Sequence, residues 1–236
     1  MLLLQVDVAL IIEKLILISV ILMGSLGIAM YATWGERKVA AIMQDRLGPN
    51  RAGPMGLLQP LADGLKLFFK EEIIPDRSTR FIFILGPCLA MLTALMTSSV
   101  IPWAPDYQIP GGRTITFQVA DINIGILFVF GVVSLGVYGV MLGGWASNNK
   151  FSLLSSIRAA SQAISYELAM GLSLIALLMM TGSLSLRDIV AQQHGFWEGN
   201  WFTWNIFKQP LGFIIFLTCA FAELNRAPFD LPECES

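Results

Sequence analysis

Long runs of apolar residues, rather than short alternating patterns, dominate this chain of 236 residues. A helix needs about 20 mostly apolar residues to cross the hydrocarbon core of a bilayer. Five segments meet or approach that length, and we place them at about 8–34, 81–101, 122–145, 157–181 and 204–222. The pattern therefore predicts an all-α integral membrane protein, with about five transmembrane helices in a single membrane domain over 1–236.

One more helix, at about 55–72, is predicted to lie in the membrane interface. Its apolar side chains follow one helical stripe and its polar side chains follow the opposite one. The apolar stripe holds Leu57, Leu58, Leu61, Leu65, Phe68 and Phe69, and the polar stripe holds Gln59, Asp63, Lys66 and Lys70. Such a helix lies flat against acyl chains or other helices. It is either a plain surface anchor or, because Gly64 leaves space beside Asp63, a wall along which a ligand passes.

Composition supports the membrane class, since 55% of the residues are hydrophobic and only 14% are charged. Soluble domains carry about 25% charged residues. A net charge of −2 argues against nucleic acid as a partner. The three scattered cysteines and the single histidine, His194, do not have the close spacing of a metal site. We therefore expect no metal centre.

The distribution of Lys and Arg predicts the orientation. Eleven of them fall on one side of the predicted spans, eight of these in the segment between the first two spans, and four fall on the other side. Basic loops stay in the cytoplasm. We expect a multi-pass protein of the cell inner (cytoplasmic) membrane, or of the equivalent organellar membrane, with its N-terminus on the outer side.

Two carboxylates are candidates for chemistry within the membrane. Glu167 lies about three turns into the fourth predicted span, and Glu223 ends the fifth. Ionisable residues inside spans are costly and by default mark proton or ion pathways. A purely structural buried glutamate is the alternative. Gln162, Ser165 and Tyr166 are the expected local hydrogen-bond partners of Glu167.

An acidic loop over 223–236 follows the fifth span. Its carboxylates are Glu223, Asp230, Glu233 and Glu235, and its one cation is Arg226. Two prolines prevent a helix there. In the third span, Gly139-x-x-x-Gly143 is typical of a face on which helices pack closely.

Together these motifs resemble a known family. They are Gly35-Glu36-Arg37-Lys38, the run from Arg46 to Pro54 that leads into Leu58-Gln59-Pro60-Leu61-Ala62-Asp63, the Gly144–Asn148 and Ser165-Tyr166-Glu167 stretches, and Ala222 to Glu235. They resemble the quinone-proximal membrane subunit, the H-type subunit, of proton-translocating NADH:quinone oxidoreductase (respiratory complex I). The resemblance covers nearly the whole chain.

The resemblance implies roles for individual residues in an oxidoreductase that translocates protons, in which this chain is not catalytic alone. The quinone tunnel would be lined by Arg37, Asp63, Gly64, Lys66 and Phe229. The carboxylates that couple quinone reduction to proton movement would be Glu36, Glu167, Glu223, Asp230, Glu233 and Glu235. Arg158 and Arg226 would pair with the acidic loop.

The same resemblance implies that quinone is the substrate and that this chain binds no cofactor, because FMN and the iron–sulfur clusters belong to partner subunits. The partners would be peripheral-arm subunits carrying the terminal cluster, other membrane-arm subunits and lipid. Family members have eight spans, so we expect the chain to be C-terminally incomplete. The anchor subunit of a related membrane-bound hydrogenase and a non-catalytic membrane scaffold are the alternative functions.

Overall fold

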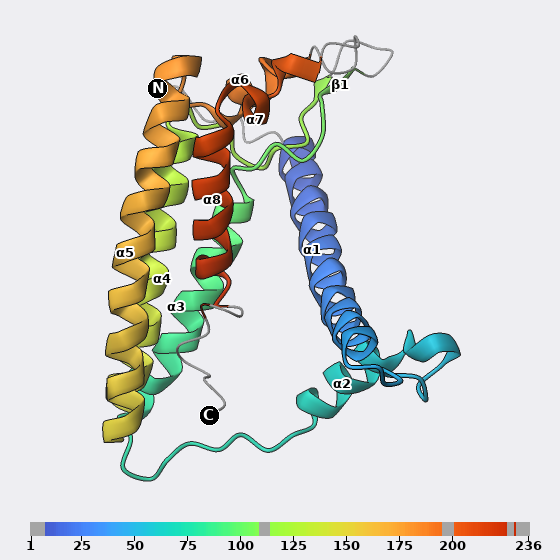
Figure 1. Ribbon diagram of the computed structural model, residues 1–236, viewed down its shortest axis with the longest axis vertical. Coiled ribbons are helices and arrows are strands. Elements are labelled where there is room, and N and C mark those ends of the chain that lie inside the picture. The colour runs from blue at the N-terminus through green and yellow to red at the C-terminus, as the bar shows by residue number, and fades with distance from the viewer. Residues whose placement is uncertain (1–7, 109–113, 195–200, 226–228, 230–236) are drawn as a thin grey trace. The chain divides into compact units, whose positions relative to one another are not determined.

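The computed structural model describes residues 8–108, 114–194, 201–225 and 229 (Figure 1). The chain divides into two compact units, residues 1–73 and 74–236. Each unit is described by itself below. The expectation of one membrane domain over 1–236 stays a prediction.

The first unit consists of one long helix and a short one. Its elements are α1 (Val8–Met43), η1 (Pro54–Gly56) and α2 (Gln59–Phe68). At 1.5 Å per residue, the 36 residues of α1 extend about 54 Å, well beyond the thickness of a hydrocarbon core. The helix continues past the predicted end near residue 34, so Glu36 and Arg37 lie inside it rather than beyond its end.

A tight turn ahead of α2 depends on Gly56. This glycine has a φ of 77°, and a Cβ there would lie 2.1 Å from the carbonyl oxygen of Pro49. Only glycine fits both constraints. Because the turn continues through this glycine, α2 begins at Gln59 and is shorter than the helix predicted over 55–72.

The second unit is a helical bundle with small elements at one end (Figure 1). The bundle helices are α3 (Arg80–Ser98), α4 (Gly125–Ala146), α5 (Lys150–Thr181) and α8 (Pro210–Glu223). The small elements are α6 (Leu186–Ala191), α7 (Asn205–Lys208), η3 (Trp201–Thr203) and the antiparallel pair β1 (Tyr107–Gln108) and β2 (Thr114–Ile115). α4 packs between α3 and α5, and α8 packs on α5.

Glycines set the spacing of the bundle. A Cβ on Gly139 would lie 2.7 Å from the carbonyl oxygen of Gly86, and a Cβ on Gly86 would lie 2.9 Å from that of Gly139. A Cβ on Gly144 would lie 2.3 Å from Ser156 Oγ. The small-residue face predicted on the third span is therefore confirmed as the surface that brings α4 against α3, and Gly144 does the same toward α5.

α8 is too short to cross the bundle. Its 14 residues extend about 21 Å, and it starts beside α6 and α7 and ends part-way along α5 (Figure 1). Glu223 is the last residue of α8, so it lies part-way along the neighbouring helices rather than at their ends.

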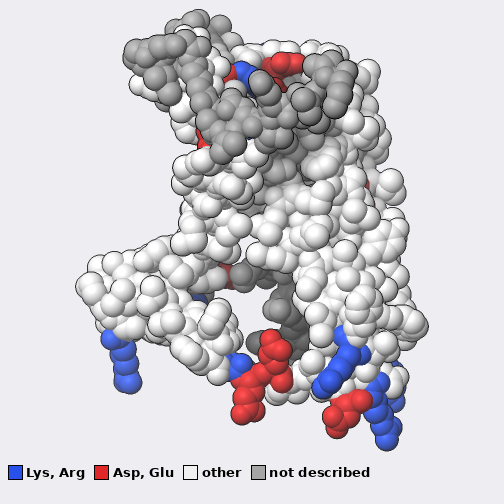
Figure 2. Space-filling view, turned by 180° about the vertical axis from the view of Figure 1, so that it is seen from behind, with Lys and Arg blue, Asp and Glu red and all other residues white. Residues whose placement is uncertain are grey.

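The outer surface of the helices is apolar, as a membrane requires. Among the described residues, four helices are long and apolar enough to cross a bilayer, and α8 is a shorter apolar helix. Figure 2 shows charged side chains toward the ends of the bundle and a surface almost without charge between them. The predicted all-α membrane class is confirmed.

At the end of the bundle that carries α6, one arginine holds the connecting segments. Arg187 donates hydrogen bonds to Asp106 and, over 3.3 Å, to Asp121. Gln118 donates to the carbonyl of Val100 over 2.8 Å. These contacts fix the long connection between α3 and α4 against α6.

Candidate functional site

Glu167 lies near the middle of α5 and faces α4. Its Oε2 lies 3.1 Å from the Ser134 hydroxyl of α4, whose single proton is shared between Glu167 and the Phe130 carbonyl of its own helix, 3.0 Å away. Its Oε1 is buried and has no hydrogen-bond partner among the described residues. The expected local partners do not take this role: Ser165 donates instead to the carbonyl of Ser161. The physical reason is geometric, because partners on the same helix turn away while α4 faces Glu167 directly.

Glu223 is a second carboxylate at membrane depth, and Tyr166 of α5 is its partner. Tyr166 and Glu223 line one small pocket between α4, α5 and α8, where the two side chains interact electrostatically. The other oxygen of Glu223, Oε2, is buried and has no hydrogen-bond partner among the described residues. Tyr166 and Glu167 are consecutive on α5, so the two carboxylates approach each other across the α5–α8 contact.

Glu167 and Glu223 both line an apolar cavity of about 660 Å³. Within the described part of the chain, Glu167 and Glu223 are its only ionisable lining residues. Its walls come mostly from α3, α4, α5 and α8 through apolar side chains such as Phe130, Met170 and Phe216. An ionised carboxylate is costly in such surroundings, and a buried oxygen without a donor raises that cost. Protonation removes the charge and supplies a donor, so these groups are suited to exchange protons.

Gln162, one turn before Tyr166 on α5, contacts the chain that follows α8. Its Nε2 donates to the carbonyl of Phe229 over 2.9 Å, and its Oε1 is buried with no partner among the described residues. Phe229 is half-buried. The predicted tunnel residue Phe229 thus lies beside the carboxylate site, whereas the sequence pattern indicated no contact between it and Gln162.

A different polar cluster occupies the first unit. Arg37 of α1 donates from Nη1 to Asp63 Oδ2 over 2.7 Å, and Gln59 donates to Oδ1 over 3.1 Å. The Arg37 hydrogen bond, followed by that from Gln59, holds the pKa of Asp63 below its usual value of 3.8. Trp34 donates to the carbonyl of Met55 over 3.4 Å. These contacts attach α2 to the end of α1.

The other predicted residues of this unit lie near the pair. Lys66 also lowers the pKa of Asp63 through its charge. A Cβ on Gly64 would meet no described atom within 4 Å, so the space beside the backbone is open there. Glu36 is exposed on α1. The cluster borders an open pocket of about 590 Å³, whose lining includes Arg46 and Arg51.

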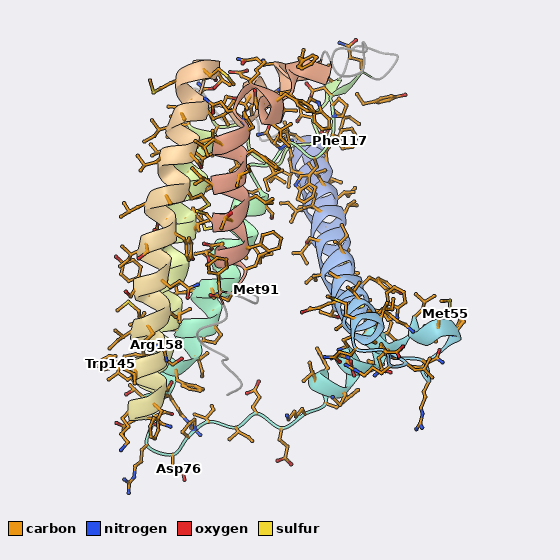
Figure 3. All side chains as sticks on the ribbon, in the orientation of Figure 1. Met55, Asp76, Met91, Phe117, Trp145 and Arg158 are labelled. Atoms are coloured by element: carbon orange, nitrogen blue, oxygen red, sulfur yellow. The ribbon has the colours of Figure 1, made fainter. Side chains whose placement is uncertain are left out.

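Several predicted residues lie elsewhere. Arg226, Asp230, Glu233 and Glu235 are outside the described residues. Arg158 is exposed on α5, toward the same end of the bundle as Trp145 (Figure 3). Its expected pairing with the acidic loop stays a prediction. Within the described parts of the chain, no three His, Cys, Asp or Glu side chains come close enough to hold a metal ion.

Helices long and apolar enough to span a bilayer, with carboxylates part-way along them, define the class of multi-pass membrane proteins. The family model described as NADH dehydrogenase matches residues 15–236. The chain belongs to this family.

Relatives named as the H subunit of NADH-quinone oxidoreductase support the assignment. The H-type subunit of NADH-quinone oxidoreductase from Cytophaga hutchinsonii is 61% identical over 232 residues, which cover 98% of this chain and 66% of the relative. Its counterpart from Flavobacterium psychrophilum is 61% identical over 230 residues, covering 98% and 65%. The counterpart from Geobacter sulfurreducens is 48% identical over 216 residues, covering 87% and 60%. The chain thus spans just under two thirds of the length of the first two. The predicted resemblance to the H-type subunit is confirmed.

Proposed function

We propose that this chain is part of the membrane subunit of a proton-translocating NADH:quinone oxidoreductase, in which it binds quinone and couples quinone reduction to proton movement. The observation that carries the proposal is the pair Glu167 and Glu223, two half-buried carboxylates, each with one buried oxygen, that line the same apolar cavity. The relatives' name indicates the reaction, which is the reduction of quinone by NADH. Glu167 and Glu223 are the groups through which protons enter the membrane arm of the complex.

The role of the carboxylates follows from their surroundings. Glu167 lies 3.1 Å from a serine hydroxyl, Glu223 shares a pocket with Tyr166, and each carboxylate has one buried oxygen without a partner among the described residues. A nearby change in charge alters the free energy of the ionised form more strongly in an apolar site than in water. A quinone that receives two electrons carries negative charge on its oxygens until it takes up two protons and becomes a neutral quinol. The carboxylates respond by taking up or releasing protons, which couples the two processes.

The first unit supplies groups suited to a quinone headgroup. A quinone presents carbonyl oxygens, which accept hydrogen bonds from donors such as the guanidinium of Arg37. That side chain is 58% exposed, and the open space beside Gly64 lies on the same short helix as its partner Asp63. The exposed apolar side chains of α2, including Leu61 and Leu65, suit an isoprenoid tail or acyl chains.

The wider assembly follows from the same proposal. Electrons come from a terminal iron–sulfur cluster in a peripheral-arm subunit, and FMN also lies in a partner subunit. Other membrane-arm subunits continue the proton pathway from Glu36, Glu167, Glu223 and the acidic residues after Phe229. The N-terminus lies on the outer side, with the basic segments in the cytoplasm.

Glu167→Gln in the assembled complex tests the proposal. Glutamine keeps the size of the side chain and its contact with Ser134 but cannot exchange a proton. In membrane vesicles we expect quinone-coupled proton pumping to fall more than tenfold, while reduction of an artificial acceptor by the peripheral arm stays at the wild-type rate. Glu71→Gln, at an exposed glutamate after α2, is the matched control and leaves both activities unchanged.

Normal pumping and normal quinone reductase activity in Glu167→Gln would exclude the proton role. An azido-quinone tests the binding role independently. Photolabelling within residues 36–66 supports a quinone site in the first unit, and labelling that avoids this chain entirely rules that site out.

A further inference from the structure

The apolar cavity that Glu167 and Glu223 line extends well beyond the two carboxylates. Along α5 its wall continues from Glu167 through Leu174 to Leu177, residues that share one face of the helix. Ten helical steps separate Glu167 from Leu177, which corresponds to about 15 Å. The wall then continues at α6, where Ile189 is buried. The cavity therefore has one acidic end and a long apolar body.

The acidic end has acceptors but no cation. Neither Glu167 nor Glu223 forms an ion pair with another described residue, and the two interact electrostatically with each other. One oxygen of each has no hydrogen-bond partner in the described part of the chain. The last side-chain torsion of a glutamate is broad, so either oxygen can turn toward the cavity. This end can therefore accept hydrogen bonds that the described residues do not supply.

The apolar body has no polar group in need of a partner among its described lining residues. Its one hydroxyl, that of Thr97, donates to the carbonyl of Thr93 within α3 over 2.8 Å. The wall also includes Phe216 and Leu224, whose side chains are exposed at the outer surface of the bundle. An amphiphile with an apolar chain can therefore enter from the apolar surface of the bundle and find polar partners at one end only.

We propose that this cavity binds a hydrophobic primary amine, with its ammonium group against Glu167 and Glu223 and its hydrocarbon chain along α5 toward α6. The site is additional to the quinone site in the first unit. It depends on the shape of the cavity and on the charge of its two carboxylates, and not on any part that they take in proton pumping.

Charge complementarity selects an amine over other amphiphiles. A primary ammonium group carries three donors and a positive charge, like the side chain of lysine, and its hydrogen bonds to carboxylates are roughly twice as strong as neutral ones. A fatty acid anion would bring a third negative charge to the acidic end. A fatty alcohol has the same chain but offers only one donor and no charge, so it fills the cavity without balancing the carboxylates.

Binding need not bring net charge into the apolar cavity. A neutral amine can take the proton of one glutamic acid, which leaves an ammonium group beside a carboxylate. An isolated ion in such surroundings is costly, whereas a close pair with further hydrogen bonds offsets the loss of water. The second glutamate supplies further acceptors to the ammonium group.

Photolabelling of the assembled complex in nanodiscs at neutral pH tests the proposal. The probe is decylamine with a diazirine at the end of its chain far from the nitrogen, and the matched probe is the corresponding alcohol. We expect the amine to label peptides covering residues 97–101 and 186–191, and an excess of unlabelled decylamine to remove this label. The alcohol should require about tenfold higher concentration, because it lacks the charge-assisted hydrogen bonds.

Variants test the two ends of the site. Glu167→Gln and Glu223→Gln should each raise the amine concentration for half-maximal labelling about tenfold, the effect of one hydrogen bond to a charged group. Ala220→Phe places a ring inside the cavity and should abolish the label. Ile214→Phe is the control, since Ile214 is exposed on the same helix and does not line the cavity, and it should label as wild type does.

Every contrary outcome has a definite meaning. Labelling that decylamine does not compete away, equal labelling by the amine and the alcohol, or wild-type labelling in both glutamine variants would each overturn the amine site. Equal losses in Ala220→Phe and Ile214→Phe would also overturn it, because they would reflect a general change in the bundle. Normal pumping in Glu167→Gln removes the proposed function and leaves this site intact, whereas absent labelling removes the site and leaves that function intact.

Discussion

The protein has carboxylates in two kinds of surroundings. Asp63, in the first unit, accepts hydrogen bonds on both oxygens, from Arg37 and Gln59, and its pKa is lowered chiefly by the arginine. Glu167 and Glu223, in the second unit, each keep one buried oxygen without a partner among the described residues. One site provides hydrogen bonds to both carboxylate oxygens, whereas each of the other two leaves one oxygen without such a bond among the described residues.

This difference suggests a division of labour between the two units. A carboxylate that stays ionised near neutral pH can hold Arg37 in place but is poorly suited to exchange protons. A carboxylate in an apolar cavity is suited to exchange protons but poorly suited to fix a cation. Under the proposed function we expect quinone binding to depend on the first unit and proton coupling on the second, so substitutions in the two units should produce different kinetic signatures.

The largest effect is expected where a substitution destroys the packing around the carboxylate cavity. In Gly139→Leu the new side chain meets the backbone of Gly86, which cannot give way as a flexible side chain can. We expect the amount of assembled complex in the membrane, measured by native gel electrophoresis, to fall more than tenfold. Gly131→Leu is the control, since a Cβ there meets no described atom within 4 Å, and it leaves assembly intact.

Removal of the second exchangeable proton should strongly reduce coupling without loss of assembly. Glu223→Gln keeps the contact with Tyr166 but cannot ionise. The expected result is a fall of about tenfold in proton pumping, with artificial-acceptor reduction unchanged. If Glu223→Gln pumps normally while Glu167→Gln does not, the two carboxylates do not act as a pair and the cavity between them has another purpose.

The fold follows from the sequence to a large extent, because spanning helices need long apolar runs and the chain has them. The small-residue pair Gly139 and Gly143 also predicts close helix packing correctly, since only glycine permits backbones to meet. The end of α1 is different. Charged residues at 36–38 look like the end of a span, but a helix continues as long as its backbone bonds are satisfied, and α1 extends to Met43.

The candidate site residues could be named from the sequence, whereas the contacts between them could not. A carboxylate inside an apolar run indicates Glu167 without any structure. Its actual partner, Ser134, is 33 residues away on another helix, and nothing in the local sequence marks it. The pairing of Arg37 with Asp63 across 26 residues is also a consequence of the turn between α1 and α2. Partner choice depends on packing, which sequence patterns do not encode locally.

An intermediate effect is expected in the first unit. Asp63→Asn removes the charge that orients Arg37, so the KM for quinone should rise about threefold, in line with the modest value of an exposed ion pair. The proton-to-electron ratio should remain at the wild-type value. A changed ratio with an unchanged KM would mean that Asp63 belongs to the proton pathway, and the contrast between the two units would fail.

The pH dependence of this pair has a definite sign. Because the pKa of Asp63 in the folded protein lies below its usual 3.8, the stabilisation from Arg37 is fully present above that value and is lost only as the pH falls through the lowered pKa. The KM for quinone should therefore show no contribution from Asp63 between about pH 6 and 8, where the carboxyl group stays ionised. The wild-type and Asp63→Asn profiles should run parallel over that range.

The smallest effect is expected from Ser134→Ala, which removes the hydrogen bond that Glu167 accepts from α4. A loss of about twofold in the rate of coupled turnover is expected, because a neutral donor at the weak end of the range contributes about 0.5 kcal/mol. Ser165→Ala is the matched control, since the Ser165 hydroxyl bonds to its own helix rather than to Glu167. Equal effects of the two substitutions would show that Ser134 does not position the carboxylate.

The contrast between the two units requires that Glu167 changes its protonation when quinone is reduced and that Asp63 does not. Infrared difference spectroscopy of the assembled complex, recorded between the oxidised and reduced quinone states, measures this directly through the stretching band of the carboxylic acid C=O. We expect a difference band that disappears in Glu167→Gln and persists in Asp63→Asn. A band that persists unchanged in Glu167→Gln, or one that disappears in Asp63→Asn, would contradict the assignment of proton coupling to the second unit.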